Sequence, residues 1–380
     1  MLYNNSKIDL KVDFQDKQLF SRSCNLKING KSIKTPLLWL GYPVGYPPKP
    51  WEYFPMETVM VNAHDFINKP SLYEEVCKKG IHEFLGFEGL IMMDSGGFIF
   101  QKKEKIDIEP SSIIEFYEKS KPDIGVILDH PFSPEKSNSD NQKRWEKTLR
   151  NTDLMIKNNG KIALMPVLHG YSLKELKNAC DQIKRINENP MLVGLGSLVP
   201  LLFNMKGSNR FKNPRNFVIE ATRLVRKEFP NSLLHTFGVG STKTMHLMYS
   251  LGVDSLDSSG WRLKAAYGNI QLPGVSDRNP TSRNNGRSSL TEKEKKILEQ
   301  CECPTCKNKS LEEKIKSLDG PFPPRALHNA WVYVQERESF IESLNEGKSK
   351  EFTEKRLRGF FSKSYDYLIN IKESKTLDRW

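Results

Sequence analysis

The sequence lacks any apolar run that approaches the roughly 20 residues of a membrane-spanning helix. Its amino-terminal stretch, MLYNNSKIDLKVDF, has no apolar core of the kind that a secretory signal peptide requires. These two absences argue against a membrane protein and against export. We therefore expect a cytoplasmic protein with no membrane partner.

Acidic residues are in deficit, with 46 against 58 lysines and arginines, which gives a formal net charge of +12. A basic chain favours a polyanionic partner such as nucleic acid. A solvated, lysine-rich surface explains the same balance equally well. Charge alone therefore leaves the partner open.

What the sequence does contain is an alternation of short apolar runs with amphipathic segments. Eight predicted strands lie at 35–41, 59–64, 89–97, 123–130, 161–170, 191–199, 233–240 and 251–260. Predicted helices lie at 71–86, 110–120, 141–159, 172–186, 215–229 and 241–251. Continuous apolar runs indicate strands buried on both faces, as in a parallel sheet covered by helices. Eight such units predict a (β/α)8 TIM barrel of the α/β class.

Polar residues and glycines stand where the predicted strands end. In a (β/α)8 barrel the carboxyl ends of the strands surround the active site, because the βα loops converge there. Asp and Gly are also ordinary turn residues, so a single position carries little weight. The joint pattern carries more, and it selects Asp94, Asp129, His169, Gly196, Gly238, Gly240 and Asp257 as candidate site residues.

Cysteine is scarce, with six in 380 residues, and three of the six are clustered. Cys301, Cys303 and Cys306 stand in CECPTCK, and His328 follows in RALHNAWVY. In a cytoplasmic protein, clustered cysteines favour metal binding over disulfides. Three thiolates and an imidazole complete a tetrahedral structural zinc site, although spacing alone leaves His328 as one candidate among seven histidines.

These segments divide the chain into four expected parts. We expect a β-rich extension over 1–34, the catalytic barrel over 35–290, a zinc-binding module over 291–335 and a basic helical segment over 336–380. The last part mixes lysine and arginine with aromatic residues at helical spacing. Such a stripe is typical of core packing with a solvated face, and also of a surface that stacks on nucleic acid.

Four motifs occur in one order along the chain. They are DSGGF at 94–98, GVGS at 238–241, LGVDSLDS at 251–258, and the C-x-C-x2-C cluster followed by HN at 328–329. This ordered set resembles the tRNA-guanine transglycosylase superfamily over about residues 35–331. The resemblance implies a pentosyltransferase that exchanges guanine in nucleic acid for a 7-deazaguanine base, with Zn2+ held by the three cysteines and His328.

The resemblance also implies roles for individual residues. Asp257 matches the family's nucleophile, and Asp94 matches the aspartate of its DSGGFQ motif, where Ile99 replaces the glutamine. Asp129 matches the carboxylate that reads the base. His169 stands where relatives carry a base-contacting glutamine, which leaves base recognition at that position open.

Two carboxylates suit base exchange for a chemical reason. Replacing a base at C1′ with retained configuration takes two displacements through a covalent glycosyl-enzyme ester, for which a carboxylate is a competent nucleophile. That role is assigned to Asp257. The departing guanine gains a proton and the incoming base loses one, so a second carboxyl acts as acid and then as base. That role is assigned to Asp94.

Small residues near these carboxylates are expected to let backbone approach a planar heterocycle. The stretch GLGSLVP at 194–200 is expected to offer backbone groups to the base in the same way. The expected substrate-binding residues are Ser95, Gly96, Gly97, Asp129, His169, Gly194, Gly196 and Gly238.

Finer resemblances bear on the polymer and the incoming base. LVPLL at 198–202 and LDSSGW at 256–261 are similar to the archaeosine branch, which implies 7-cyano-7-deazaguanine (preQ0) as the incoming base. Compact length and substitutions at family positions resemble best the DNA-modifying branch, often called DpdA. We therefore expect DNA as the polymer, with tRNA as the alternative. A helper ATPase or helicase would open the duplex, since no helicase-type phosphate loop is found here.

Two other classes stay open at this stage. A non-catalytic zinc-containing nucleic-acid-binding protein explains the charge and the cysteines but has no need of both Asp94 and Asp257. A glycoside hydrolase uses two strand-end aspartates on a barrel but leaves the cysteine cluster and the basic charge unexplained. The oligomeric state is open as well.

Overall fold

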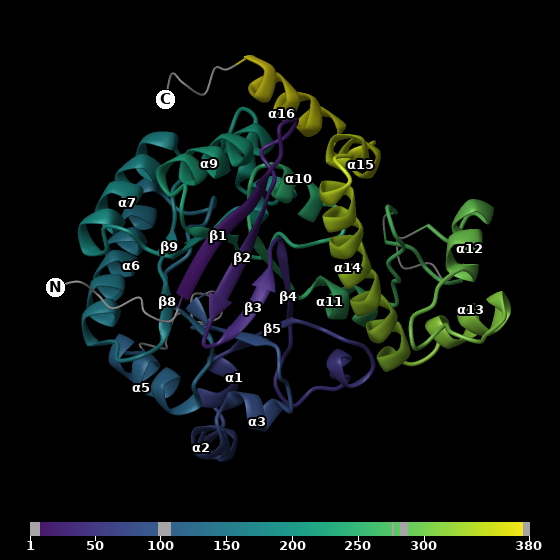
Figure 1. Ribbon diagram of the computed structural model, residues 1–380, viewed down its shortest axis with the longest axis horizontal. Coiled ribbons are helices and arrows are strands. Elements are labelled where there is room, and N and C mark those ends of the chain that lie inside the picture. The colour runs from purple at the N-terminus through teal and green to yellow at the C-terminus, as the bar shows by residue number, and fades with distance from the viewer. Residues whose placement is uncertain (1–7, 98–107, 276, 282–287, 375–380) are drawn as a thin grey trace.

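The computed structural model describes residues 8–97, 108–275, 277–281 and 288–374 (Figure 1). In this described part of the chain, no helix combines the length and the apolar character needed to cross a membrane.

The main body is a parallel sheet rolled into a barrel, as the alternating pattern predicts. In chain order its strands are β4 (Leu37–Gly41), β5 (Thr58–Asn62), β6 (Leu90–Asp94), β7 (Ile124–Val126), β8 (Ala163–Met165), β9 (Val167–Leu168), β10 (Leu192–Leu195), β11 (Leu233–Thr236) and β12 (Ser255–Ser258). Their order in the sheet is β8-β7-β6-β5-β4-β12-β11-β10-β9. The two edge strands, β8 and β9, are consecutive in the chain, so the sheet is nearly closed. The (β/α)8 prediction is confirmed.

The fifth predicted strand is divided into β8 and β9 at Pro166. Proline has no N–H to donate to a ladder, so a strand is interrupted where it occurs. Before Pro166, β8 pairs with β7; after it, β9 pairs with β10. Eight predicted strands thus appear as nine, and the barrel closes through this one interrupted strand.

Strand side chains alternate between two apolar layers, both of them buried. Met60, Met92 and Trp39 belong to the cluster that fills the barrel interior. Val61 and Met93 belong to a cluster between the strands and the surrounding helices. Burial on both faces explains why the strands read as continuous apolar runs.

Helices surround the barrel on its outside (Figure 1). They are η1 (Pro50–Glu52), α1 (His64–Ile67), α2 (Pro70–Lys79), α3 (Ile81–Leu85), α5 (Pro110–Ser120), α6 (Asn138–Asn158), α7 (Leu173–Ile186), α8 (Val199–Leu202), η2 (Ser208–Arg210), α9 (Pro214–Glu228), α10 (Met245–Ser250) and α11 (Gly260–Ala266). The single helix predicted over 71–86 is two helices, because Gly80 takes a φ of 82° and ends α2 there.

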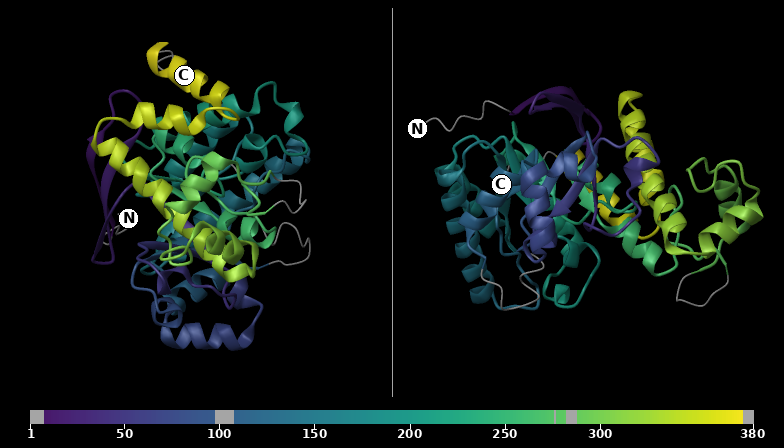
Figure 2. Two further views of the ribbon diagram at one scale, coloured as in Figure 1. Left: turned by 90° about the vertical axis from the view of Figure 1, so that its right-hand side faces the viewer. Right: turned by 90° about the horizontal axis from the view of Figure 1, so that it is seen from below.

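A three-stranded antiparallel sheet covers one end of the barrel, as Figure 2 shows. It comprises β1 (Ile8–Gln15), β2 (Arg22–Ile28) and β3 (Lys31–Lys34). Arg22 donates to both oxygens of Asp254, at 2.7 and 2.8 Å, just before β12 begins. Asn29 donates to Asp123, just before β7 begins. The sheet therefore covers the amino ends of the barrel strands and leaves their carboxyl ends to the loops.

The remaining helices are α12 (Glu292–Glu299), α13 (Leu311–Asp319), α14 (Phe322–Asn345), α15 (Ser349–Leu357) and α16 (Ser362–Ser374). α12 and α13 stand apart from the barrel, and α14 connects them to it (Figures 1 and 2). α14 is continuous through position 335, so the expected boundary between the zinc module and the last segment falls inside a helix. The four-part division of the chain stays a proposal.

Candidate active site and zinc site

Asp94, the last residue of β6, is one of three carboxylates at the carboxyl ends of the barrel strands. Burial raises the pKa of its carboxyl to about 8, the charges of Asp129 and Asp257 act in the same direction, and backbone N–H groups of Ser95 and Gly96 oppose the shift. Asp94 therefore holds a proton at neutral pH and is suited to give it up.

Asn62, which the sequence motifs do not include, fixes the orientation of this carboxyl. It pairs with Asp94 in the β5–β6 register, and its Nδ2 donates to Asp94 Oδ2 at 2.9 Å. Its Oδ1 accepts from the backbone N–H of His64, which sets the orientation of the amide. The signal that could have found Asn62 is a polar residue ending an apolar strand, the same signal that found Asp94.

Asp257 lies in β12 and is almost completely buried. Its Oδ1 accepts from the backbone N–H of Gly238 at 2.6 Å and lies 3.3 Å from Nε2 of His235. Gly238 takes a φ of 70°, a conformation that favours glycine. The GVGS turn after β11 is thus shaped to present an amide to Asp257.

Asp129 follows the end of β7 by three residues and is buried against His169. His169 Nε2 lies 2.9 Å from Asp129 Oδ2, and its Nδ1 lies 2.9 Å from Ser197 Oγ. The backbone of Asp129 approaches so closely that a Cβ at Gly97 would overlap it. With both ring nitrogens engaged and the ring buried, His169 lies behind Asp129 as its support.

Gly194 and Gly196, two other predicted base-binding positions, lie where neighbouring rings leave no room for a side chain. A Cβ at Gly196 would overlap the ring of His169, and one at Gly194 would overlap that of Phe237. The amides of these two glycines donate to Leu168 and Pro166, in the sheet. Their contact with a base stays a prediction.

Two further positions of the predicted loop differ in what the structure says of them. Ser95 is buried, and its hydroxyl donates to the carbonyl of Ile127 at 3.1 Å. Its predicted contact with the base likewise stays a prediction. Ile99 lies outside the described residues.

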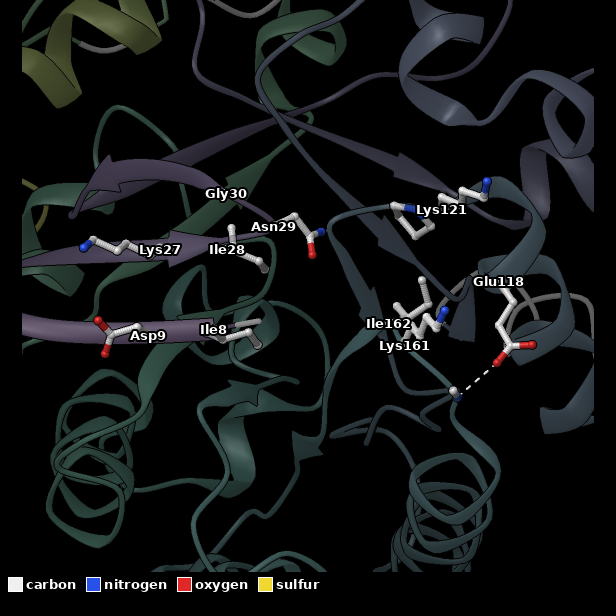
Figure 3. A pocket seen from close by; sticks show the side chains of 12 residues that line it. Ile8, Asp9, Lys27, Ile28, Asn29, Gly30, Glu118, Lys121, Lys161 and Ile162 are labelled. Atoms are coloured by element: carbon white, nitrogen blue, oxygen red, sulfur yellow. Dashed lines mark hydrogen bonds between the residues drawn. The ribbon is translucent and has the colours of Figure 1, made fainter. Parts of the chain in front are cut away.

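A hollow lies at the opposite end of the barrel (Figure 3). It measures about 1110 Å3 and lies between the small sheet and the starts of β7 and β8. Lys27, Lys121 and Lys161 line it together with Asp9 and Glu118. The hollow has both acidic and basic lining residues, and it lies at the amino ends of the strands. It is therefore distinct from the site that contains Asp94, Asp129 and Asp257.

The cysteine cluster closes around one histidine, as the motif predicts. The ligand atoms of Cys301, Cys303, Cys306 and His328 lie within 4.8 Å of one another. The three Sγ atoms lie 3.5, 3.5 and 3.7 Å from Nδ1 of His328. A tetrahedral zinc ion with Zn–S of about 2.3 Å and Zn–N of about 2.0 Å requires S···N separations of about 3.5 Å. The four residues fit that ion.

A further contact sets the ring of His328 for metal binding. Its Nε2 donates to the carbonyl of Gln271 at 2.8 Å, so the lone pair of Nδ1 faces the sulfur atoms. Spacing alone could not distinguish this histidine from six others. The fold does so, because α14 brings it beside the cysteines.

Comparisons with known proteins bear on the family to which this chain belongs. A family model described as queuine tRNA-ribosyltransferase matches residues 16–362. Similar proteins include the tRNA-guanine(15) transglycosylases of Methanococcus aeolicus (28% identical, over 91% of this chain and 52% of that protein), Pyrococcus furiosus (27%, 92% and 56%) and Pyrococcus abyssi (27%, 92% and 56%). This chain spans about half the length of these curated relatives.

These findings confirm the superfamily that the motifs predict, but they do not support the narrower expectation of a DNA-modifying branch, since the relatives are named for tRNA. A tRNA-ribosyltransferase transfers a pentosyl group, so the family consists of pentosyltransferases. The chain belongs to the queuine tRNA-ribosyltransferase family.

Proposed function

We propose that this chain is a guanine transglycosylase, which replaces guanine in nucleic acid with a 7-deazaguanine base. One observation carries the proposal: a carboxyl with a pKa of about 8, Asp94, lies close enough to Asp257 and Asp129 to be influenced by their charges. A proton donor beside a carboxylate is what a retaining double displacement at C1′ requires.

In the proposed reaction, Asp257 attacks C1′ and forms an ester with the sugar. Asp94 gives its proton to the departing guanine. The incoming base then gives a proton back to Asp94 and displaces Asp257, which restores both groups. Asp129 is assigned to base recognition, with His169 holding it in place, and a structural zinc at the cysteine cluster supports the fold.

For the polymer, we propose tRNA. The relatives named above support this choice, whereas the expectation of DNA depends only on length and substitutions. 7-Cyano-7-deazaguanine remains the proposed incoming base, on the strength of LVPLL and LDSSGW. Neither the fold nor the relatives supply support for a helper ATPase.

The polymer is tested by exchange of labelled guanine into tRNA, single-stranded DNA and duplex DNA, side by side. We expect label in tRNA alone, and its displacement when unlabelled 7-cyano-7-deazaguanine is added. Hydrolysis of simple glycosides, measured in parallel, should be absent. Label in DNA with none in tRNA would reverse the choice of polymer, and label in neither would refute the proposed activity.

The pH dependence tests the role of Asp94. A general acid with a pKa of about 8 is protonated below that pH and loses its proton above it. We therefore expect kcat/KM to be level below pH 8 and to fall about tenfold per pH unit above it. In Asp94→Asn, the rate should be about 10²- to 10⁴-fold lower, and the decline above pH 8 should be absent. A parental profile that is level to pH 9.5 would assign the acid elsewhere.

A further inference from the structure

A buried histidine lies behind the proposed nucleophile. His235, in β11, has no exposed surface, and its Nε2 lies 3.3 Å from Oδ1 of Asp257. Its Nδ1 lies 2.9 Å from Oγ of Ser255, which accepts a 2.7 Å hydrogen bond from the indole N–H of Trp39. The four side chains form a continuous series of hydrogen bonds that ends on the carboxylate.

The chemistry of these groups restricts where the protons lie. An indole N–H only donates, so Trp39 occupies one lone pair of the Ser255 oxygen, and the hydroxyl proton of Ser255 is available to point at Nδ1 of His235. A carboxylate only accepts, so the ring nitrogen that faces Asp257 carries a proton. A neutral imidazole with its proton on Nε2 meets both conditions.

Both donors converge on one oxygen of the carboxylate. The N–H of Gly238 and Nε2 of His235 meet Oδ1 of Asp257, while no described residue hydrogen-bonds to Oδ2. We propose, on the basis of the function proposed above, that His235 is a positioning residue: with Gly238 it holds Oδ1 and leaves Oδ2 of Asp257 as the oxygen that attacks C1′.

The bond changes balance with this assignment. A lone pair of Oδ2 forms the bond to C1′ while the bond from C1′ to the base nitrogen breaks. The electron pair of that bond leaves with guanine, which takes the proton of Asp94. Oδ1 becomes the carbonyl oxygen of the ester and keeps its two N–H donors throughout.

A second series of the same kind supports Asp129. The backbone N–H of Phe132 donates to Ser197 Oγ at 2.8 Å, Ser197 Oγ lies 2.9 Å from Nδ1 of His169, and Nε2 of His169 lies 2.9 Å from Asp129. Ser197 takes a φ of 65°, which is costly for a residue other than glycine. Each series runs from an N–H through serine and histidine to a carboxylate.

Asp94 differs from both of these carboxylates. Its side-chain partner in the described chain is the neutral amide of Asn62. The barrel thus gives two carboxylates a buried histidine donor and leaves the third, the proposed acid, without one. The proposed nucleophile, Asp257, and the proposed acid, Asp94, therefore differ in the hydrogen-bond donor that faces them.

Two substitutions at position 235 test the role. His235→Leu keeps similar bulk without a donor, and we expect the rate constant of covalent adduct formation in a single turnover to fall about 100-fold. His235→Gln keeps an N–H near the position of Nε2, and we expect its rate within about tenfold of the parent. Affinity for tRNA should be unchanged in both. A parental rate in His235→Leu would overturn the inference, and so would equal losses in the two variants.

NMR can show which ring nitrogen of His235 carries the proton, and this measurement does not depend on enzymatic activity. In the zinc-loaded parent labelled with ¹⁵N-histidine, and assigned by the signal missing from His235→Gln, we expect His235 to carry its proton on Nε2. Ser255→Ala should reduce that preference. A proton on Nδ1 in the parent would overturn the inference whatever the activity. A parent with no exchange would overturn the proposed function and the role of Oδ2, while the NMR result still decides the hydrogen bonds.

Discussion

Asp257→Asn is expected to abolish base exchange, with a fall in rate of at least about 10⁴-fold. The amide has nearly the same shape as the carboxylate and keeps an oxygen for the N–H of Gly238, but its nitrogen has no lone pair to give to C1′. The covalent adduct between enzyme and nucleic acid should disappear with the activity. The measurement is single-turnover guanine release, with the adduct followed on a denaturing gel.

Asp153→Asn supplies the matched control for that substitution. Asp153 lies on α6 and pairs with Lys157 on the surface, so its loss should leave exchange and adduct formation at the parental level. Affinity for tRNA should be equal in the parent and both variants. An Asp257→Asn protein that still exchanges at the parental rate would remove Asp257 from the mechanism.

Cys303→Ala is expected to cost the protein its zinc and much of its stability. The Cys303 side chain is buried, and structural zinc sites of this type contribute about 10–16 kcal/mol in small peptides. We expect zinc content to fall from one ion per chain to nearly none, and soluble yield and thermal midpoint to fall with it. Elemental analysis and thermal unfolding measure the two effects.

The control here is Cys77→Ala, which removes a partly buried thiol on α2 outside the cluster. It should keep one zinc per chain and a midpoint close to that of the parent. Purified parent protein that is folded and free of zinc would refute the zinc proposal. A zinc-free Cys303→Ala protein with parental stability would show that the ion is not structural.

The barrel was predictable because both faces of each strand are buried. That burial makes the strands continuous apolar runs, and a polar residue at the end of such a run stands out. Asp94, Asp129 and Asp257 all stand at such positions. The interruption at Pro166 and the helix break at Gly80 are local effects. A proline in a strand and a glycine in a helix signal such breaks, but the apolar pattern continues across both positions and therefore predicts one unbroken element.

The hydrogen-bond donors behind the carboxylates were less predictable. His235 and Ser255 are partners in the β11–β12 register, and Asp257 lies two residues beyond Ser255 on the same face. Only the pairing of strands makes these three residues neighbours. Likewise, the support of Asp129 by His169 depends on Ser197, from a third strand end. A single sequence shows such residues but not the register that joins them.

α14 joins the cysteine cluster to the barrel over a short distance. It carries His328, and one residue later Asn329 donates to the carbonyls of Trp261 and Asn269. Two turns further, Glu336 lies 2.8 Å from Nε2 of His246, and Arg337 donates to the carbonyl of Pro36, next to β4.

If the cluster binds zinc as proposed, metal binding and barrel folding are linked equilibria that share one helix. Once free zinc exceeds its dissociation constant, each tenfold increase adds about 1.4 kcal/mol to the free energy of unfolding. α14 carries both the metal ligand His328 and the contacts to the barrel. Part of this increase in the free energy of unfolding therefore stabilises the barrel. Zinc bound as proposed would therefore stabilise the barrel as well as the cysteine cluster that holds it.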